Sequence, residues 1–245
     1  MFLIVRNDQH LLFGYDGFFI KRIRPGLSLE NADDLGLGPL GLIDRITMSP
    51  GVVVPLHLHR NDELLSYIMH GNLIHIDDKG ERYLLTPTKF MMMSAGRGIF
   101  HSESVPLRRE PLEMLQIAIR PHTANLTPTV SFHKFPSDAY PNHWRLVAGA
   151  ENSRAPLFIR NDVLIFDIRF VNDQLSLPDL NGQTAFLYVL GGELFIPEFN
   201  SRLIDGDGVL LTVQNISLKS LAECRLILFI VDTLSWFTRE GIISG

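Results

Sequence analysis

The sequence predicts an all-β protein built from two similar β-barrels. Short apolar runs of strand length recur along the 245 residues and are separated by turn residues. No long stretch with helical periodicity competes with them, and a short motif containing tyrosine, glycine and leucine occurs twice. Short strands at this spacing are typical of a β-sandwich or barrel.

The order of apolar runs and turn signals defines the predicted elements. Examples of predicted strands are residues 41–48, 64–69, 115–119 and 226–231. Turn residues separate such runs at positions 49–51, 77–80, 86–87, 191–192 and 205–208. Clusters of Gly, Pro, Asn, Asp and Ser mark turns because they tolerate the required backbone angles. We expect short helical turns near residues 137–140 and 233–240.

An internal repeat indicates that one fold is present twice. Residues 66–73 resemble residues 187–194, with tyrosine, glycine and leucine at one common offset. Each stretch is followed by a turn and another apolar run, as expected for two copies of one unit. We therefore expect an N-terminal barrel over residues 1–125 and a C-terminal barrel over residues 126–245, joined around residues 121–136.

Two histidine-containing strands carry the predicted chemistry. His57 and His59 follow a Ser-Pro-Gly turn, and His101 and Glu103 follow a glycine-rich turn. Side chains two residues apart on a strand point to the same face. Two such strands facing each other would present three imidazoles and one carboxylate to one point. The pattern predicts a metal site with the ligands His57, His59, His101 and Glu103.

The second copy of the unit does not carry this pattern. His57 and His59 project onto Pro178 and Leu180, and residues 219–223 replace the strand of His101. No histidine follows His143. The C-terminal barrel is therefore predicted to be a degenerate copy without metal ligands.

The ligand types limit the range of candidate metals but do not identify one. Neutral imidazoles suit Fe, Ni, Cu, Mn or Zn, and a carboxylate extends the preference towards Fe and Mn. Four protein ligands in an octahedral field leave two positions for a substrate oxygen and for water or dioxygen. Such open positions distinguish a catalytic metal site from a closed structural one.

Two further residues near the motif have open interpretations. Glu63 can be a ligand, a general base or a carboxylate that orients a histidine N–H, and we favour the last role. His75 alternates with apolar residues in the run from Leu73 to Asp77. It points either into the barrel near the metal or towards solvent.

Composition and charge exclude several classes of protein. The chain is 46% hydrophobic and 20% charged, with a net charge of −5. Its densest basic cluster is Arg108-Arg109. Because binding to the phosphates of a nucleic acid needs a basic stripe, a nucleic-acid-binding surface is not expected. The lone Cys224 excludes internal disulfides and lies in a run that reads as a buried strand. The first residues read neither as a signal peptide nor as a membrane anchor, which favours a cytoplasmic protein.

Together these motifs resemble those of a known family. The spacing from Gly51 through His57, His59 and Glu63 to Gly71 is similar to the first cupin motif. Gly98 and His101 are similar to the second. More specifically, residues 57–67 and 93–103 resemble the pirin family, and the similarity continues through residues 115–121 and 144–148. Leu58 departs from the proline that many pirins have between the histidines, and residues 72–77 are less acidic than usual.

The resemblance implies a bicupin with a single metal, commonly iron, in its N-terminal barrel, bound by His57, His59, His101 and Glu103. Some bacterial pirins show quercetin 2,3-dioxygenase activity, in which a flavonol ring opens with loss of carbon monoxide. Glu103 would then accept the substrate proton, with Glu63 as the alternative base. The animal namesake is a nuclear transcriptional co-regulator, so a regulatory protein that binds metal and a protein partner is the alternative. We expect a monomer in either case.

Overall fold

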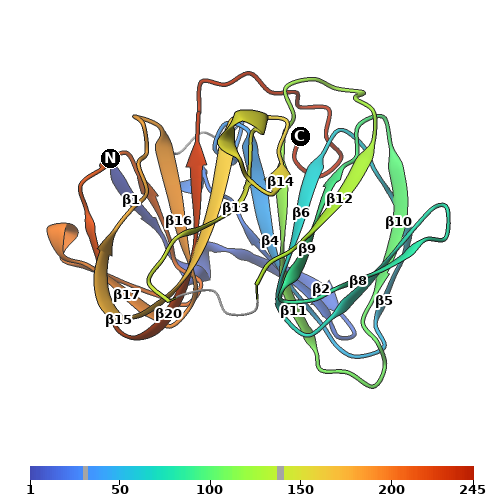
Figure 1. Cartoon of the computed structure of the whole chain (residues 1–245), viewed down its shortest axis with the longest axis horizontal. Helices are drawn as coiled ribbons and strands as arrows, with labels where there is room; N and C mark the ends of the chain where they lie inside the picture. Colours follow the sequence, from blue (N-terminus) through green and yellow to red (C-terminus); the bar gives the residue numbers. More distant parts are fainter. Residues whose placement is uncertain (30–32, 137–140) are drawn as a thin grey trace.

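A computed structural model describes residues 1–29, 33–136 and 141–245. The molecule consists of two β-lobes side by side, with most of the blue-to-green half of the chain in one and most of the yellow-to-red half in the other (Figure 1). The predicted all-β fold with two cupin barrels is confirmed. The helical turn expected at residues 137–140 lies outside the described residues.

Two sheets form the N-terminal barrel. One has seven strands in the order β12-β9-β6-β11-β4-β3-β2, and the other has four in the order β5-β10-β7-β8. The strands of the barrel are β2 (Leu11–Tyr15), β3 (Phe18–Ile23), β4 (Leu40–Met48), β5 (Val53–His59), β6 (Glu63–His70), β7 (Leu73–Asp77), β8 (Arg82–Leu85), β9 (Lys89–Ser94), β10 (Ile99–Ser104), β11 (Leu112–Ile119) and β12 (Thr129–Lys134).

One nine-stranded sheet curls into the C-terminal barrel. Its main path runs β1-β19-β16-β20-β15-β13-β14, while β17 pairs with β18 and β20. The strands are β1 (Phe2–Val5), β13 (Arg145–Gly149), β14 (Leu157–Phe158), β15 (Val163–Ser176), β16 (Thr184–Gly191), β17 (Glu193–Ile196), β18 (Ser201–Ile204), β19 (Gly208–Leu211) and β20 (Ser217–Val231).

Helical structure in the described residues is limited to four short 3-10 helices. They are η1 (Asn7–Gln9), η2 (Leu27–Leu29), η3 (Glu151–Ser153) and η4 (Pro197–Phe199). Of the helical turn predicted at residues 233–240, the structure has one hydrogen-bonded turn at Thr233 and Leu234, followed by irregular chain. No helix among the described residues is long and apolar enough to span a membrane.

The internal repeat has a structural cause at its glycines. Gly71 joins β6 to β7 with φ +74°, and Gly192 joins β16 to β17 with φ +84°. A Cβ on Gly71 would lie 2.4 Å from the carbonyl oxygen of Pro111, and one on Gly192 would lie 2.3 Å from that of Glu223. Both turns press against a neighbouring strand at a positive φ, which only glycine accommodates without strain.

The two halves of the chain exchange their end segments. β1 pairs with β19 and so belongs to the C-terminal sheet. Residues 242–244 return to the N-terminal barrel, where the backbone N–H groups of Ile242 and Ser244 each donate a 3.0 Å hydrogen bond to Asp62. The red end of the chain lies over the other lobe in Figure 1. The domain division at residues 125/126 stays a prediction, and the barrels are not contiguous along the chain.

Packing between the lobes is continuous. One apolar cluster contains N-terminal residues such as Leu115 together with C-terminal residues such as Phe229, and a second cluster fills the C-terminal barrel. Leu180, which stands where the first copy has a histidine, is a member of this second cluster. Cys224 is fully buried there, as predicted. A hydrogen bond of 2.7 Å from the Tyr67 hydroxyl to Asp167 crosses between the lobes.

Candidate metal centre

Three histidines meet on the inner face of the four-stranded sheet. β5 and β10 are antiparallel neighbours, with His101 opposite His57 and Ile99 opposite His59. The ring centroid of His101 is 4.4 Å from that of His57 and 4.9 Å from that of His59. One nitrogen from each of the three rings can be chosen so that all lie within 4.8 Å of one another. The period-two spacing thus brings the predicted imidazoles together.

Glu103 belongs to the same buried cluster, but a shift in strand register gives it a different cross-strand neighbour. A bulge in β5 places Glu103 opposite Val54, although His101 is opposite His57. The carboxyl of Glu103 groups with His101 and His75, and one of its oxygens lies 4.0 Å from Nδ1 of His101. His101 is therefore shared by two groups: the three histidines of β5 and β10, and the set that contains the carboxylate.

His75 lies inside the barrel, which settles its direction. It is on β7, opposite Glu103, and is fully buried. Its Nδ1 atom lies 2.9 Å from Nδ1 of His101, and the ring centroids are 4.6 Å apart. The alternation of His75 with apolar neighbours left both directions open, and the structure selects the inward one.

Several buried polar atoms of this cluster have no hydrogen-bond partner. They are both ring nitrogens of His59, Nε2 of His75, Nε2 of His101 and Oε1 of Glu103. Buried polar atoms in folded proteins are nearly always paired, so such a concentration needs an explanation. A cation bound among the imidazoles and the carboxylate would pair with one nitrogen of each ligating ring and with Oε1 of Glu103. The donor set therefore fits a divalent transition metal.

Burial keeps the imidazoles neutral. It lowers the pKa of His59 to about 3 and that of His101 to about 2, with further lowering from neighbouring histidines. Burial likewise lowers the pKa of His75 to about 4. Metal ligation requires an unprotonated nitrogen, so these side chains are ready to bind at neutral pH. Burial raises the pKa of Glu103 to about 7.

Glu63 takes no part in either group. It is fully buried at the start of β6, and its Oε2 accepts a 2.7 Å hydrogen bond from the backbone N–H of Arg160. Burial raises the pKa of its carboxyl. Within the described residues, Glu63 has no hydrogen bond to a histidine, so the favoured orienting role lacks the expected contact. A role as general base stays a prediction.

The loop after His59 is held by residues that sequence reasoning missed. Asp62 is fully buried, and its carboxylate accepts hydrogen bonds from three successive backbone N–H groups, those of Ile242, Ile243 and Ser244. The hydroxyl of Ser244 donates to it at 2.7 Å. Only the acidic character of the loop signalled this role, since the partner segment is far away in sequence.

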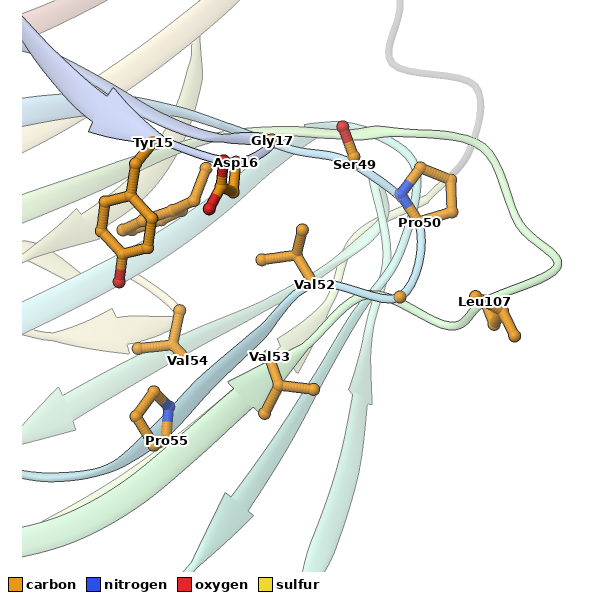
Figure 2. A pocket seen from close by; sticks show the side chains of 12 residues that line it. Tyr15, Asp16, Gly17, Ser49, Pro50, Val52, Val53, Val54, Pro55 and Leu107 are labelled. Carbon is orange, nitrogen blue, oxygen red and sulfur yellow. The ribbon is translucent and has the colours of Figure 1, made fainter.

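A groove opens at the start of the ligand strand β5. Its volume is about 680 Å³, and it runs between the β2–β3 hairpin and the β4–β5 loop. Tyr15 lies on one side, and Val52 and Val54 lie on the other (Figure 2). Because Val54 is the cross-strand neighbour of Glu103, the groove adjoins the strand pair that carries the cluster.

Comparison with known proteins agrees with the fold and the motifs. The pirin family profile matches residues 35–119. Quercetin 2,3-dioxygenase from Escherichia coli (strain K12) is 26% identical over 80% of this chain and 83% of its own length. Pirin from Homo sapiens is also 26% identical, over 71% of this chain and 66% of its own. The chain is similar to pirin-family cupins.

Solved structures support the pirin fold over nearly the whole chain. The crystal structure of YhhW from Escherichia coli superposes with a TM-score of 0.80 at 21% identity, and covers 94% of this chain and 97% of that one. The nickel(II) complex of this bacterial pirin gives a TM-score of 0.81, with coverage of 96% and 100%. At this identity the similarity establishes the fold, and the chemistry is argued from the residues.

Proposed function

We propose that this pirin-family protein is a metal-dependent dioxygenase of the quercetin 2,3-dioxygenase type, acting on a flavonol-like aromatic substrate. The observation that carries the proposal is the cluster of buried, unpaired imidazole and carboxylate atoms inside the N-terminal barrel. The names of the bacterial relatives supply the substrate class and the reaction.

The proposed ligand set is His57, His59, His101 and Glu103. Fe(II) is the first candidate for the metal, followed by Ni, Cu, Mn and Zn. When bound, such a metal acidifies and polarises the oxygens of a coordinated substrate and provides a centre for dioxygen chemistry. The second barrel has no comparable cluster among its described residues, so we expect about one metal per chain.

Glu103 is our candidate for the proton acceptor. It lies within the cluster, and burial places its pKa at about 7, close to the working pH of a neutral cell. A substrate hydroxyl that loses its proton on binding can therefore pass it to this carboxylate. Glu63 is the alternative base, with a pKa also raised by burial, but it lies outside the cluster.

The groove beside β5 offers a place for the substrate rings. Its volume is within the range of small-molecule sites, and apolar or aromatic side chains such as Tyr15, Phe18 and Val54 line it. A planar aromatic ligand would bury apolar area against these side chains. Val54 lines the groove and is the cross-strand partner of Glu103, so it is our choice for a blocking substitution.

Elemental analysis of the purified protein and oxygen uptake with quercetin test the proposal. We expect about one transition metal per chain, and uptake that is lost in His101→Ala together with the metal. His70→Ala is the matched control, because His70 is exposed and pairs with Glu110. Bound metal without uptake across a panel of flavonols would contradict the dioxygenase assignment.

A metal-binding regulatory protein without turnover is the second candidate. The free edge strand β2 favours it, because all five residues from Leu11 to Tyr15 are exposed and none is charged. Natural sheets usually protect such edges, and peptide segments of partner proteins can extend them. This candidate predicts stable metal binding with no oxygen uptake. Both candidates assume a cytoplasmic monomer.

A further inference from the structure

His75 is the one residue of the cluster that the proposed ligand set does not use. It lies on β7, beside the ligand strand β10, and its side chain is fully buried. It belongs to the group with His101 and Glu103, and not to the group formed by His57, His59 and His101. It therefore borders the metal centre and touches it through His101.

The contact between the two rings constrains their protons. The Nδ1 atoms of His75 and His101 are 2.9 Å apart, a normal hydrogen-bond distance. Between two neutral imidazoles, one Nδ1 atom must carry the hydrogen and the other must offer its lone pair. Each ring then has the opposite tautomer to its neighbour.

Only one of the two arrangements leaves His101 able to bind a metal through its unpaired nitrogen. If Nδ1 of His101 donates to His75, the lone pair of Nε2 of His101 is free for the metal. If the donor is His75, Nε2 of His101 carries a hydrogen and cannot ligate. In the structure Nε2 of His101 is buried and has no hydrogen-bond partner, as required of a nitrogen kept for a cation.

We propose that His75 is a positioning residue that accepts a hydrogen bond from Nδ1 of His101 and so presents Nε2 of His101 to the metal. A partner of this kind on the far nitrogen fixes the tautomer and the ring orientation of a ligating histidine. The inference rests on the metal centre proposed above, but not on the identity of the substrate.

Two amide substitutions separate this role from simple packing. The amide of His75→Asn lies near the position of Nδ1, so Asn can still accept from His101. The amide of His75→Gln lies nearer the position of Nε2 and cannot. Both variants carry the same amide group, and Gln is closer to histidine in volume, so a greater loss in the Gln variant reports on the hydrogen bond and not on packing. His70→Asn, on the exposed end of β6, is the control.

Titration with Ni(II) is the primary readout, and it does not depend on turnover. We expect His75→Gln to weaken nickel binding by about 10- to 100-fold, the usual effect of removing such a partner. His75→Asn should keep most of the affinity, and all variants should bind one nickel per chain. Equal affinities for the Asn and Gln variants would refute the inference.

X-ray absorption of the nickel-loaded protein excludes the remaining alternative. We expect the number of coordinating imidazoles to be the same in the wild type and in His75→Asn. One coordinating imidazole fewer in His75→Asn would make His75 a ligand and overturn the positioning role. The role would also be overturned if the wild type bound two nickel ions and His75→Asn bound one. A wild type that binds nickel without turning over quercetin would refute only the dioxygenase proposal, whereas one that binds no nickel would refute both.

Discussion

Replacing Asp62 by asparagine tests how the loop after His59 is held. Oδ2 of Asp62 accepts hydrogen bonds from the N–H groups of Ile242 at 3.0 Å and Ile243 at 3.1 Å. Oδ1 accepts from the N–H of Ser244 at 3.0 Å and from its hydroxyl at 2.7 Å. Asparagine keeps one oxygen and turns an NH2 group towards donors on the other side.

The magnitude follows from the two bonds that asparagine cannot make. Hydrogen bonds to a charged group contribute about 1.5 kcal/mol each at the low end, so two lost bonds predict a destabilisation of about 3 kcal/mol. For a chain of this size that corresponds to a fall in Tm of about 6–12 °C. Because the loop follows His59 directly, nickel affinity should fall as well.

Calorimetry measures the loss of stability in Asp62→Asn, and limited proteolysis measures the release of the C-terminal segment. We expect the lower Tm together with earlier cleavage near residues 241–245. Asp179→Asn is the control, because Asp179 is exposed and accepts one turn hydrogen bond from Asn181. That change should alter stability by less than about 0.5 kcal/mol. An Asp62→Asn protein within about 1 kcal/mol of the wild type, with unchanged proteolysis, would refute the reasoning.

Three further predictions concern the metal centre. His57→Ala should lose most of its nickel, as measured by elemental analysis, and keep the fold, as measured by circular dichroism. Full nickel occupancy in this variant would show that His57 is not a ligand. Because burial raises the pKa of Glu103 to about 7, nickel must displace a proton from this carboxyl below that pH. For each pH unit below 7, the nickel affinity of the wild type should therefore fall about tenfold more than the nickel affinity of Glu103→Gln. The same pH dependence in both proteins, measured by nickel titration, would contradict this. Val54→Trp should fill the groove and raise the KM for quercetin without loss of metal, so an unchanged KM would place the substrate elsewhere.

The three clustered histidines could be predicted from the sequence because a strand repeats every two residues. His57 and His59 share a face by that rule, and the antiparallel pairing of β5 with β10 brings His101 opposite them. The bulge that shifts Glu103 to a position opposite Val54 was not predicted. The one signal of this bulge in the sequence is Pro55, because proline within a strand occurs at sheet edges and bulges.

The directions of His75 and Glu63 depend on contacts that a local pattern does not contain. Alternation in β7 shows that His75 and its neighbours occupy opposite faces, but not which face is inside. Glu63 pairs with the backbone of Arg160, a residue of the other half of the chain. Only the docking of the two lobes creates that contact, so reasoning from the loop alone assigned Glu63 to a histidine.

The exchange of end segments between the lobes has a consequence for how the protein is made. The N-terminal hydrogen bond from Met1 to Thr212 and the contact of Asp62 with Ser244 each close a loop of more than half the chain. Such distant contacts form late and slow the folding of β proteins. During synthesis, the loop beside His59 stays without its anchor until residues 242–244 have left the ribosome. Binding of a metal at the proposed centre is therefore expected to follow the synthesis of these residues rather than accompany it.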